Sequence, residues 1–324
     1  MSEVKCNDQI KNEYRIINGD CRIILPTLES NSVDCVVTSP PYWGLRDYNV
    51  DGQIGLEDTM ETYIKTLTAV SSEIYRVLKP EGTYWLNLGD KYATSCLSGQ
   101  GDPTSGKKPK GAFVPFPRKT DLPNKCLMML PERVAISLIS SGWILRNKII
   151  WAKTNPMPSS AIDRFTSSHE MIYFFTKKAK GYYFNQEAVK EPAVTTKKRS
   201  PAGAKGKIKL TRNRWDVWNL ATAGSERVDV VDAIHYAKFP QSLVRLCLLA
   251  GCPENGIVLD PFSGSGTTGK VAIELGCKYV GIELNPVYAV LSETKIESNE
   301  EGVSMRYQSF DPTCMSVSHK VEDV

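Results

Sequence analysis

Two glycine templates overlap in one segment near the C-terminus of this 324-residue chain, and either could bind a nucleotide. Gly264, Gly266 and Gly269 match the G-x-G-x-x-G pattern of dinucleotide-binding loops. Gly264, Gly269 and Lys270 nearly match the phosphate-binding P-loop, but Val271 stands where a serine or threonine would hold magnesium. A glycine pattern of either kind is weak alone, so the surrounding residues must decide between them.

The surroundings of the glycines favour a third ligand. We expect a strand over 256–260, a helix over 267–275 and a second strand over 278–284. Glu283, at the tip of the second strand, suits the paired hydroxyls of a ribose. Asp260 would repel a pyrophosphate but attract an ammonium, and the helix N-terminus near Thr267 would take a carboxylate. S-Adenosylmethionine (AdoMet) carries all three groups. We therefore favour it over a dinucleotide, ATP or a purely structural turn.

A second constellation, made of Ser39, Pro40, Pro41 and Tyr42, follows a strand expected over 33–37. Ligands of an open α/β sheet bind just beyond the carboxyl ends of its strands. Taken alone, the Pro-Pro pair is better explained as a rigid turn. Because an AdoMet site is expected in the same chain, we interpret this segment as the part of the site that holds the methyl acceptor.

The two segments together resemble a known family. Asp-Pro-Phe-Ser-Gly-Ser-Gly-Thr at 260–267 and Thr-Ser-Pro-Pro-Tyr-Trp at 38–43 look like the motifs of DNA amino-methyltransferases, which modify N4 of cytosine or N6 of adenine. The acceptor motif precedes the AdoMet motif, with a basic insert between them, as in the circularly permuted group often called beta. The resemblance covers nearly the whole chain. It implies AdoMet as cofactor and double-stranded DNA as partner.

The resemblance also implies roles for individual residues. The catalytic set is Ser39, Pro40, Pro41 and Tyr42. In it, Ser39 and the Pro40 carbonyl accept hydrogen bonds from the target amino group, and Tyr42 stacks on the flipped base. The cofactor set comprises Asp20 near the adenine, Glu283 at the ribose, and the pocket or loop residues Phe239, Pro240, Asp260, Phe262, Gly264, Gly266 and Thr267.

Ser39 bears on the target atom. Two acceptors that hold the amino hydrogens can rehybridise the nitrogen toward the methyl group, and the nitrogen loses its proton easily afterwards, so no strong base is needed. In the family that the chain resembles, serine at this position accompanies N4-cytosine and aspartate or asparagine accompanies N6-adenine. We therefore predict an N4-cytosine enzyme, with N6-adenine as the alternative. C5-cytosine chemistry is disfavoured because the sequence contains no Pro-Cys.

A basic stretch predicts where DNA phosphates bind. Residues 177–214 carry twelve Lys or Arg against two Glu, or +10, while the whole chain carries only +4. Such a stretch could release counterions from DNA, although a solvated linker would have the same composition. The predicted DNA-binding residues are Arg164, Lys197, Lys198, Arg199, Lys205, Lys207, Arg212 and Arg214.

The elements that must position these residues alternate between strands and helices. We expect an α/β, Rossmann-like three-layer sandwich whose mostly parallel sheet ends in an antiparallel strand pair. Further helices are expected over 60–78, 131–141 and 239–250, strands over 15–18, 83–88, 143–153 and 170–176, and an irregular C-terminus from residue 297. The predicted units are a catalytic region (1–178), a target-recognition insert (179–230) and an AdoMet-binding region (231–324).

Composition excludes several other classes. Hydrophobic content of 41% with 23% charged residues is that of a globular chain. The nine cysteines are scattered, without a C-x-x-C pair, so we expect reduced thiols, a cytoplasmic protein and no metal site. We expect no membrane span, a monomer or homodimer, and a restriction endonuclease acting on the same DNA sequence without direct binding. A non-catalytic DNA-binding protein and an RNA or protein methyltransferase remain as alternatives.

Overall fold

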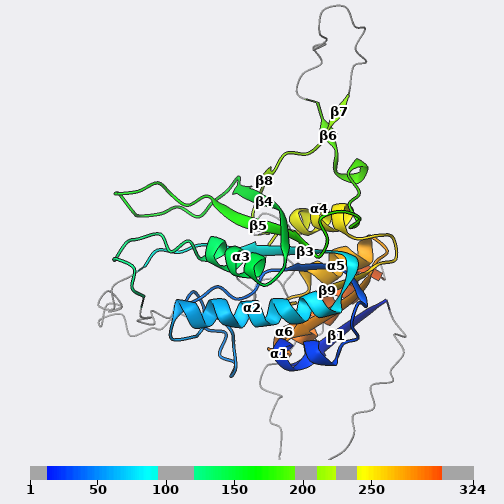
Figure 1. The fold of residues 1–324 in the computed structure, drawn as a ribbon, viewed down its shortest axis with the longest axis horizontal. Coiled ribbons are helices and arrows are strands. Elements are labelled where there is room, and N and C mark those ends of the chain that lie inside the picture. The colour runs from blue at the N-terminus through cyan, green and yellow to red at the C-terminus, as the bar shows by residue number, and fades with distance from the viewer. Residues whose placement is uncertain (1–12, 94–119, 194–209, 224–238, 301–324) are drawn as a thin grey trace, which may run out of the picture.

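A computed structural model describes residues 13–93, 120–193, 210–223 and 239–300, and it forms an eight-stranded sheet between two helical layers (Figure 1). In spatial order the strands are β1 (Tyr14–Asn18), β10 (Lys278–Glu283), β9 (Ile257–Asp260), β2 (Val33–Thr38), β3 (Leu78–Leu88), β5 (His169–Thr176), β4 (Ile144–Lys153) and β8 (Val217–Leu220). Each strand pairs in parallel with its neighbours except β5, which runs antiparallel to both β3 and β4. The predicted three-layer, mostly parallel fold is confirmed.

Helices cover both faces of the sheet. One face carries α1 (Cys21–Ile24), the 3-10 turn η1 (Leu25–Thr27), α2 (Met60–Val77) and α3 (Leu130–Ser140). The other carries α4 (Gln241–Gly251), α5 (Thr267–Glu274) and α6 (Pro286–Glu300). Alternate residues of β2 supply the two cores, with Val36 on the first face and Cys35 and Val37 on the second. This alternation is the two-residue period of a strand buried on both sides.

The junction between α2 and β3 differs from the prediction. Thr59 caps α2 by accepting a hydrogen bond from the Thr62 amide at 3.1 Å, and the helix runs as expected to Val77. Residues 79–82, between the predicted helix and the predicted strand, belong instead to β3. Leu78 pairs with Val33 and Thr83 pairs with Cys35, so the segment of β3 between these pairs is longer than the facing segment of β2. The extra residues of β3 form a bulge. The helix therefore ends directly in a central strand.

Parts of the predicted insert pack on the main sheet, and the proposed division of the chain stays a prediction. Strand β8 lies within the predicted 179–230 unit, yet it is an edge strand of the main sheet, beside β4. The backbone amide of Asn185 donates to the carbonyl of Ala250 at 2.8 Å, so the start of that unit also packs on the catalytic body. Among the described residues of that unit, the short pair β6 (Glu191–Pro192) and β7 (Thr211–Arg212), after the 3-10 turn η2 (Glu187–Val189), stands away from the body in Figure 1.

The C-terminal helix was not predicted. Helix α6 extends to Glu300, past the residue where we expected an irregular chain, and its Ile296 and Ser292 are fully buried beside α5. No helix in the described part of the chain is long and apolar enough to cross a membrane. Within the same residues, no group of three or more His, Cys, Asp or Glu side chains could hold a metal ion.

The sheet has one topological switch point, between β9 and β2. The chain leaves β9 for α5 on one face, whereas it leaves β2 for α2, which covers the opposite face. The two connections diverge and leave a crevice at the carboxyl ends of these strands, where open α/β sheets bind ligands. Both motifs of interest begin at this edge.

Candidate active site

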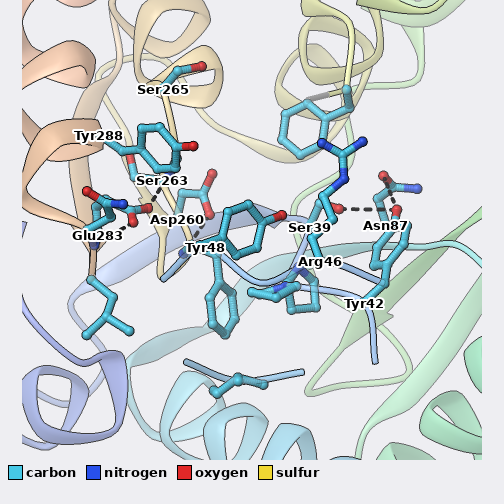
Figure 2. A pocket seen from close by; sticks show the side chains of 18 of the residues that line it. Ser39, Tyr42, Arg46, Tyr48, Asn87, Asp260, Ser263, Ser265, Glu283 and Tyr288 are labelled. Atoms are coloured by element: carbon cyan, nitrogen blue, oxygen red, sulfur yellow. Dashed lines mark hydrogen bonds between the residues drawn. The ribbon is translucent and has the colours of Figure 1, made fainter. Parts of the chain in front are cut away.

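A cavity of about 590 Å³ lies at this crevice (Figure 2). It is lined by all the predicted catalytic and cofactor residues except Pro240 and Gly266, namely Asp20, Ser39, Pro40, Pro41, Tyr42, Phe239, Asp260, Phe262, Gly264, Thr267 and Glu283. In Figure 2, Ser39, Tyr42 and Asn87 cluster at one end of the cavity, while Glu283, Ser263 and Tyr288 gather at the other. The cavity thus has two chemically different ends.

The glycine loop after β9 is shaped by close approach to α6. Gly264 and Gly266 have φ of 54° and 79°, the left-handed region that favours glycine. A Cβ on Gly266 would meet the Ser292 hydroxyl at 2.4 Å, so Gly266 supports the loop from behind rather than lining the cavity. The loop then leads directly into the N-terminus of α5 at Thr267.

Glu283 fixes this loop from the end of β10. Its carboxylate accepts the backbone amides of Gly264 at 2.7 Å and Asn285 at 2.8 Å. Burial raises the pKa of Glu283 above its ordinary value, against the lowering effect of these two hydrogen bonds. A carboxylate held in this way, at a cavity wall, retains acceptor capacity for the hydroxyls of a ribose.

Asp260 joins three elements. Its carboxylate accepts the Thr38 hydroxyl at 2.5 Å, the Thr268 hydroxyl at 2.7 Å and the Phe262 amide at 3.0 Å. Burial raises the pKa of Asp260 to about 6, although these hydrogen bonds act to lower it. The structure therefore gives Asp260 a bracing role between β9, β2 and α5. Its predicted contact with a ligand ammonium stays a prediction.

Other residues at the cofactor end fit a nucleoside bearing an amino acid. The Ser265 hydroxyl is buried at the cavity wall, and within the described residues it has no hydrogen-bond partner. Such an orphaned group is explained if a bound ligand satisfies it. Tyr48 and Tyr288 face each other edge to face at 6.4 Å and line the same end with Phe262, which supplies flat apolar surface.

Asp20 and Pro240 each stand at the start of a helix. Asp20 caps α1 and forms an ion pair with Arg22 at 2.5 Å, while Arg22 also donates to the Gly52 carbonyl at 2.6 Å. Burial acts to raise the pKa of Asp20, but the hydrogen bonds and charge of Arg22 lower it below its ordinary value. Pro240 is the N-cap of α4 and is buried, and it does not line the cavity.

The acceptor end centres on Tyr42. Its hydroxyl donates to Glu170 at 2.7 Å and lies 3.4 Å from both Ser39 Oγ and Asn87 Oδ1. The ring packs so tightly on the chain after β3 that a Cβ on Gly89 would lie 2.6 Å from it. Burial raises the pKa of Tyr42 well above its ordinary value, and the Glu170 charge raises it further, so the hydroxyl keeps its proton.

Comparison with known proteins identifies the family. A family model described as DNA methylase, of the N6/N4 type, matches residues 33–294. The chain is also 42% identical over 292 residues to the Type II methyltransferase M.SmaI of Serratia marcescens, covering 90% of this chain and 94% of that protein. The chain belongs to the DNA methylase family. It is similarly 41% identical to the Type II methyltransferase M.Cfr9I of Citrobacter freundii, over 90% of each chain.

Solved structures agree with this fold. The PvuII DNA methyltransferase (cytosine-N4-specific) superposes with a TM-score of 0.63 at 19% identity, over 88% of this chain and 86% of that one. A putative DNA modification methylase of Thermus thermophilus, complexed with S-adenosyl-L-methionine, gives 0.55 at 23% identity, over 90% and 96% of the two chains. The Rossmann-like architecture expected from the motifs is thereby confirmed for this DNA methylase.

Sequence reasoning missed three polar residues of this DNA methylase that meet beneath Tyr42. Asn87, Lys153 and Glu170 all line the cavity. Lys153 ends β4, whereas Glu170 lies near the start of the antiparallel β5, so topology brings both to the edge where β3 presents Asn87. In the sequence, each of these three residues is a polar side chain near the end of a predicted strand, and this position could have indicated a site residue.

The predicted DNA-binding residues of the methylase divide into two groups. Lys197, Lys198, Arg199, Lys205 and Lys207 lie outside the described residues. Of the others, Arg164 stacks 4.0 Å above the Tyr92 ring. Both Arg212 and Arg214 form ion pairs with Glu191, at 2.7 and 3.3 Å. These two arginines therefore hold β6 and β7 together. A DNA phosphate that bound either arginine would compete with Glu191 for its guanidinium group.

Proposed function

We propose that this DNA methylase transfers a methyl group from AdoMet to the exocyclic N4 of a flipped cytosine in double-stranded DNA, as the modification enzyme of a Type II restriction–modification system. The observation that carries the proposal is the shared cavity. Ser39 to Tyr42 and the loop from Asp260 to Thr267 line one space of about 590 Å³, at the switch point of the sheet. A base and a cofactor bound there would lie against each other.

The cofactor end supports AdoMet through its own donors and acceptors. Glu283 would hold the ribose, and the unpartnered Ser265 hydroxyl would meet a polar group of the cofactor. Phe262, Tyr48 and Tyr288 offer aromatic surface to the adenine and the sulfonium. When bound, AdoMet supplies an electrophilic methyl group on its positively charged sulfur. The Thermus relative, in which AdoMet is bound, has the same fold.

The acceptor end supports an amino group as the target. Ser39 and the Pro40 carbonyl would hold the two amino hydrogens, which directs the nitrogen lone pair out of the ring plane and toward the cofactor end. Tyr42 would stack on the base once it is extruded, because the amino nitrogen is inaccessible within the duplex. Glu170 and Lys153 are engaged with each other at 2.5 Å. No further side chain is needed as a base, because the methylated nitrogen is cationic and loses its proton easily.

Cytosine rather than adenine is favoured by Ser39, which stands where N6-adenine enzymes of this group carry an aspartate or asparagine. The structural match to a cytosine-N4-specific enzyme adds support, while the family as a whole includes both targets. Adenine N6 is therefore the second candidate. Both reactions need the same stacking surface at Tyr42 and the same pair of acceptors.

The test is expression in a bacterial host that lacks amino-methylated bases, followed by nucleoside mass spectrometry of its DNA. We expect N4-methylcytosine from the wild-type protein and none from Ser39→Ala, with AdoMet affinity unchanged in the variant by calorimetry. Detection of N6-methyladenine alone would replace cytosine by adenine. Detection of neither base, with AdoMet binding intact, would refute DNA as the substrate.

The restriction–modification setting and the recognition insert are proposals of the same kind. M.SmaI and M.Cfr9I are Type II methyltransferases, so we propose that a restriction endonuclease shares the recognition sequence of this enzyme. The β6–β7 pair and the basic stretch between its strands would form the target-recognition element. Single-molecule sequencing of the modified DNA would give the recognition sequence, and replacing residues 193–210 by a Gly/Ser linker would abolish modification at it.

A further inference from the structure

A partly buried ion pair beside Tyr42 is not used by the proposed reaction. Lys153 Nζ lies 2.5 Å from Glu170 Oε1, and the two side chains are only 21% and 16% exposed. The other carboxylate oxygen of Glu170 accepts the Tyr42 hydroxyl at 2.7 Å and the Asn87 amide at 3.2 Å. Burying two charges is costly, so such a pair at the wall of an active-site cavity calls for an explanation beyond stability.

The ion pair sets the direction of a chain of hydroxyls. An ionised carboxylate can only accept hydrogen bonds, so Tyr42 must donate its proton to Glu170. The Tyr42 oxygen is then left as an acceptor for the Ser39 hydroxyl, which lies 3.4 Å away. Asn87 reinforces this direction, because its amide nitrogen donates to Glu170 and to the Met171 carbonyl, leaving only its oxygen toward Tyr42.

The consequence reaches the target base. Once the Ser39 proton points at Tyr42, the lone pairs of the Ser39 oxygen are free to face the cavity. An amino group offers hydrogens and has no usable acceptor while its lone pair is delocalised, so only a serine oriented in this way can hold it. A serine whose proton faced the cavity would oppose the amino group instead.

We propose that Glu170 is a positioning residue for methyl transfer, which acts through Tyr42 to keep Ser39 an acceptor for the amino group of the target base. The proposal rests on the proposed function, because it presupposes an amino group at Ser39. Gly89 contributes to the same arrangement by letting the Tyr42 ring lie close against the backbone. Lys153 contributes by neutralising Glu170 and fixing which carboxylate oxygen faces Tyr42.

Glu170→Gln tests the direction of the chain without changing its shape. Lys153 can only donate, so it will attract the amide oxygen of the glutamine and turn the amide nitrogen toward Tyr42. The tyrosine must then accept, and its own proton is shared between Asn87 Oδ1 and Ser39 Oγ, which both lie 3.4 Å away. The Ser39 hydroxyl therefore loses its fixed direction, and its proton is free to enter the cavity. We expect the single-turnover methyl-transfer rate on duplex DNA to fall by about tenfold or more, with AdoMet affinity unchanged.

A second substitution makes the test specific to orientation. In Lys153→Met/Glu170→Gln the amide is free to rotate, so its oxygen can again accept from Tyr42, and we expect part of the lost rate to return. Tyr42→Phe removes the relay while retaining the ring, and adding Glu170→Gln to it should cost nothing more. The matched control is Glu132→Gln, which neutralises an ion-paired glutamate of similar burial, 2.6 Å from Lys148 and outside the cavity.

The outcomes separate this inference from the proposed function. A Glu170→Gln rate within twofold of wild type, or a double variant no faster than Glu170→Gln, overturns the positioning role. If Glu170→Gln does not fold, as judged by circular dichroism, Tyr42→Phe alone must show the loss, and an unchanged Tyr42→Phe rate overturns the role. A wild-type protein that methylates no DNA refutes the proposed function instead, whatever the variants do.

Discussion

Neutralising Asp260 is expected to stabilise the fold at neutral pH. The Asp260 carboxylate is 1% exposed, and burial raises its pKa from the ordinary value of 3.8 to about 6. Asp260→Asn keeps the shape and the hydrogen bonds, because its amide oxygen can accept from Thr38 and Phe262. The Thr268 hydroxyl can rotate to accept from the amide nitrogen. The variant therefore loses the charge and little else.

The sign and size of the effect follow from proton linkage. Because the pKa is higher in the folded state, the favourable contribution of the protonated carboxyl is fully present below pH 3.8 and is lost as pH rises through about 6. At about 1.4 kcal/mol per pKa unit, the ionised carboxylate costs the wild type about 3 kcal/mol at pH 8. At pH 5 the cost is about half of that.

The assay is urea unfolding of wild type and Asp260→Asn at pH 5 and pH 8. The variant should gain in free energy of unfolding relative to wild type, and the gain should be larger at pH 8 by about 1.5 kcal/mol. Asp163→Asn is the control, because the hydrogen bond from Lys125 at 2.6 Å and the charge of Lys125 lower the pKa of that exposed carboxyl, which reverses the sign of the effect. A gain that does not grow with pH, or a loss at both values, would refute the argument.

Three further predictions concern the site. Gly266→Ala should lower the free energy of unfolding by about 2 kcal/mol in urea unfolding and weaken AdoMet binding, since its Cβ meets Ser292 at 2.4 Å. Gly276→Ala has a similar φ with open space around it, so a loss as large would contradict the steric explanation. Gly89→Ala should slow methyl transfer, because the added Cβ displaces the Tyr42 ring. Calorimetry should find AdoMet affinity unchanged, and an equal loss of AdoMet binding would contradict this explanation. Affinity for non-specific duplex DNA should fall linearly on a log–log plot against salt, and a flat plot would exclude phosphate binding by the basic stretch.

Local patterns were sufficient for the parts of the site that one segment builds. The strand, glycine loop and helix around Gly264 follow from residues within one stretch, and so does the turn that carries Ser39. The position of Glu170 at a strand end was visible in the sequence, but its contact with Tyr42 was not. That contact depends on β5 pairing antiparallel with β3, a strand that is distant in the sequence. Strand β8 was missed for a related reason. Its four residues lie near a basic, loop-like stretch, and pairing with β4 is what makes them a strand.

A buried hydrogen bond links the two motifs. Thr38 and Asp260 are 222 positions apart, yet β2 and β9 pair in parallel with Cys35 opposite Val258, so both strands end at the same edge. Thr38 immediately precedes Ser39, and its hydroxyl donates to the carboxylate that braces the glycine loop. The acceptor end and the cofactor end are therefore held in register by the sheet and by Asp260. Their order along the chain does not matter to this geometry, which is why a permuted sequence can assemble the site as long as these two strands pair.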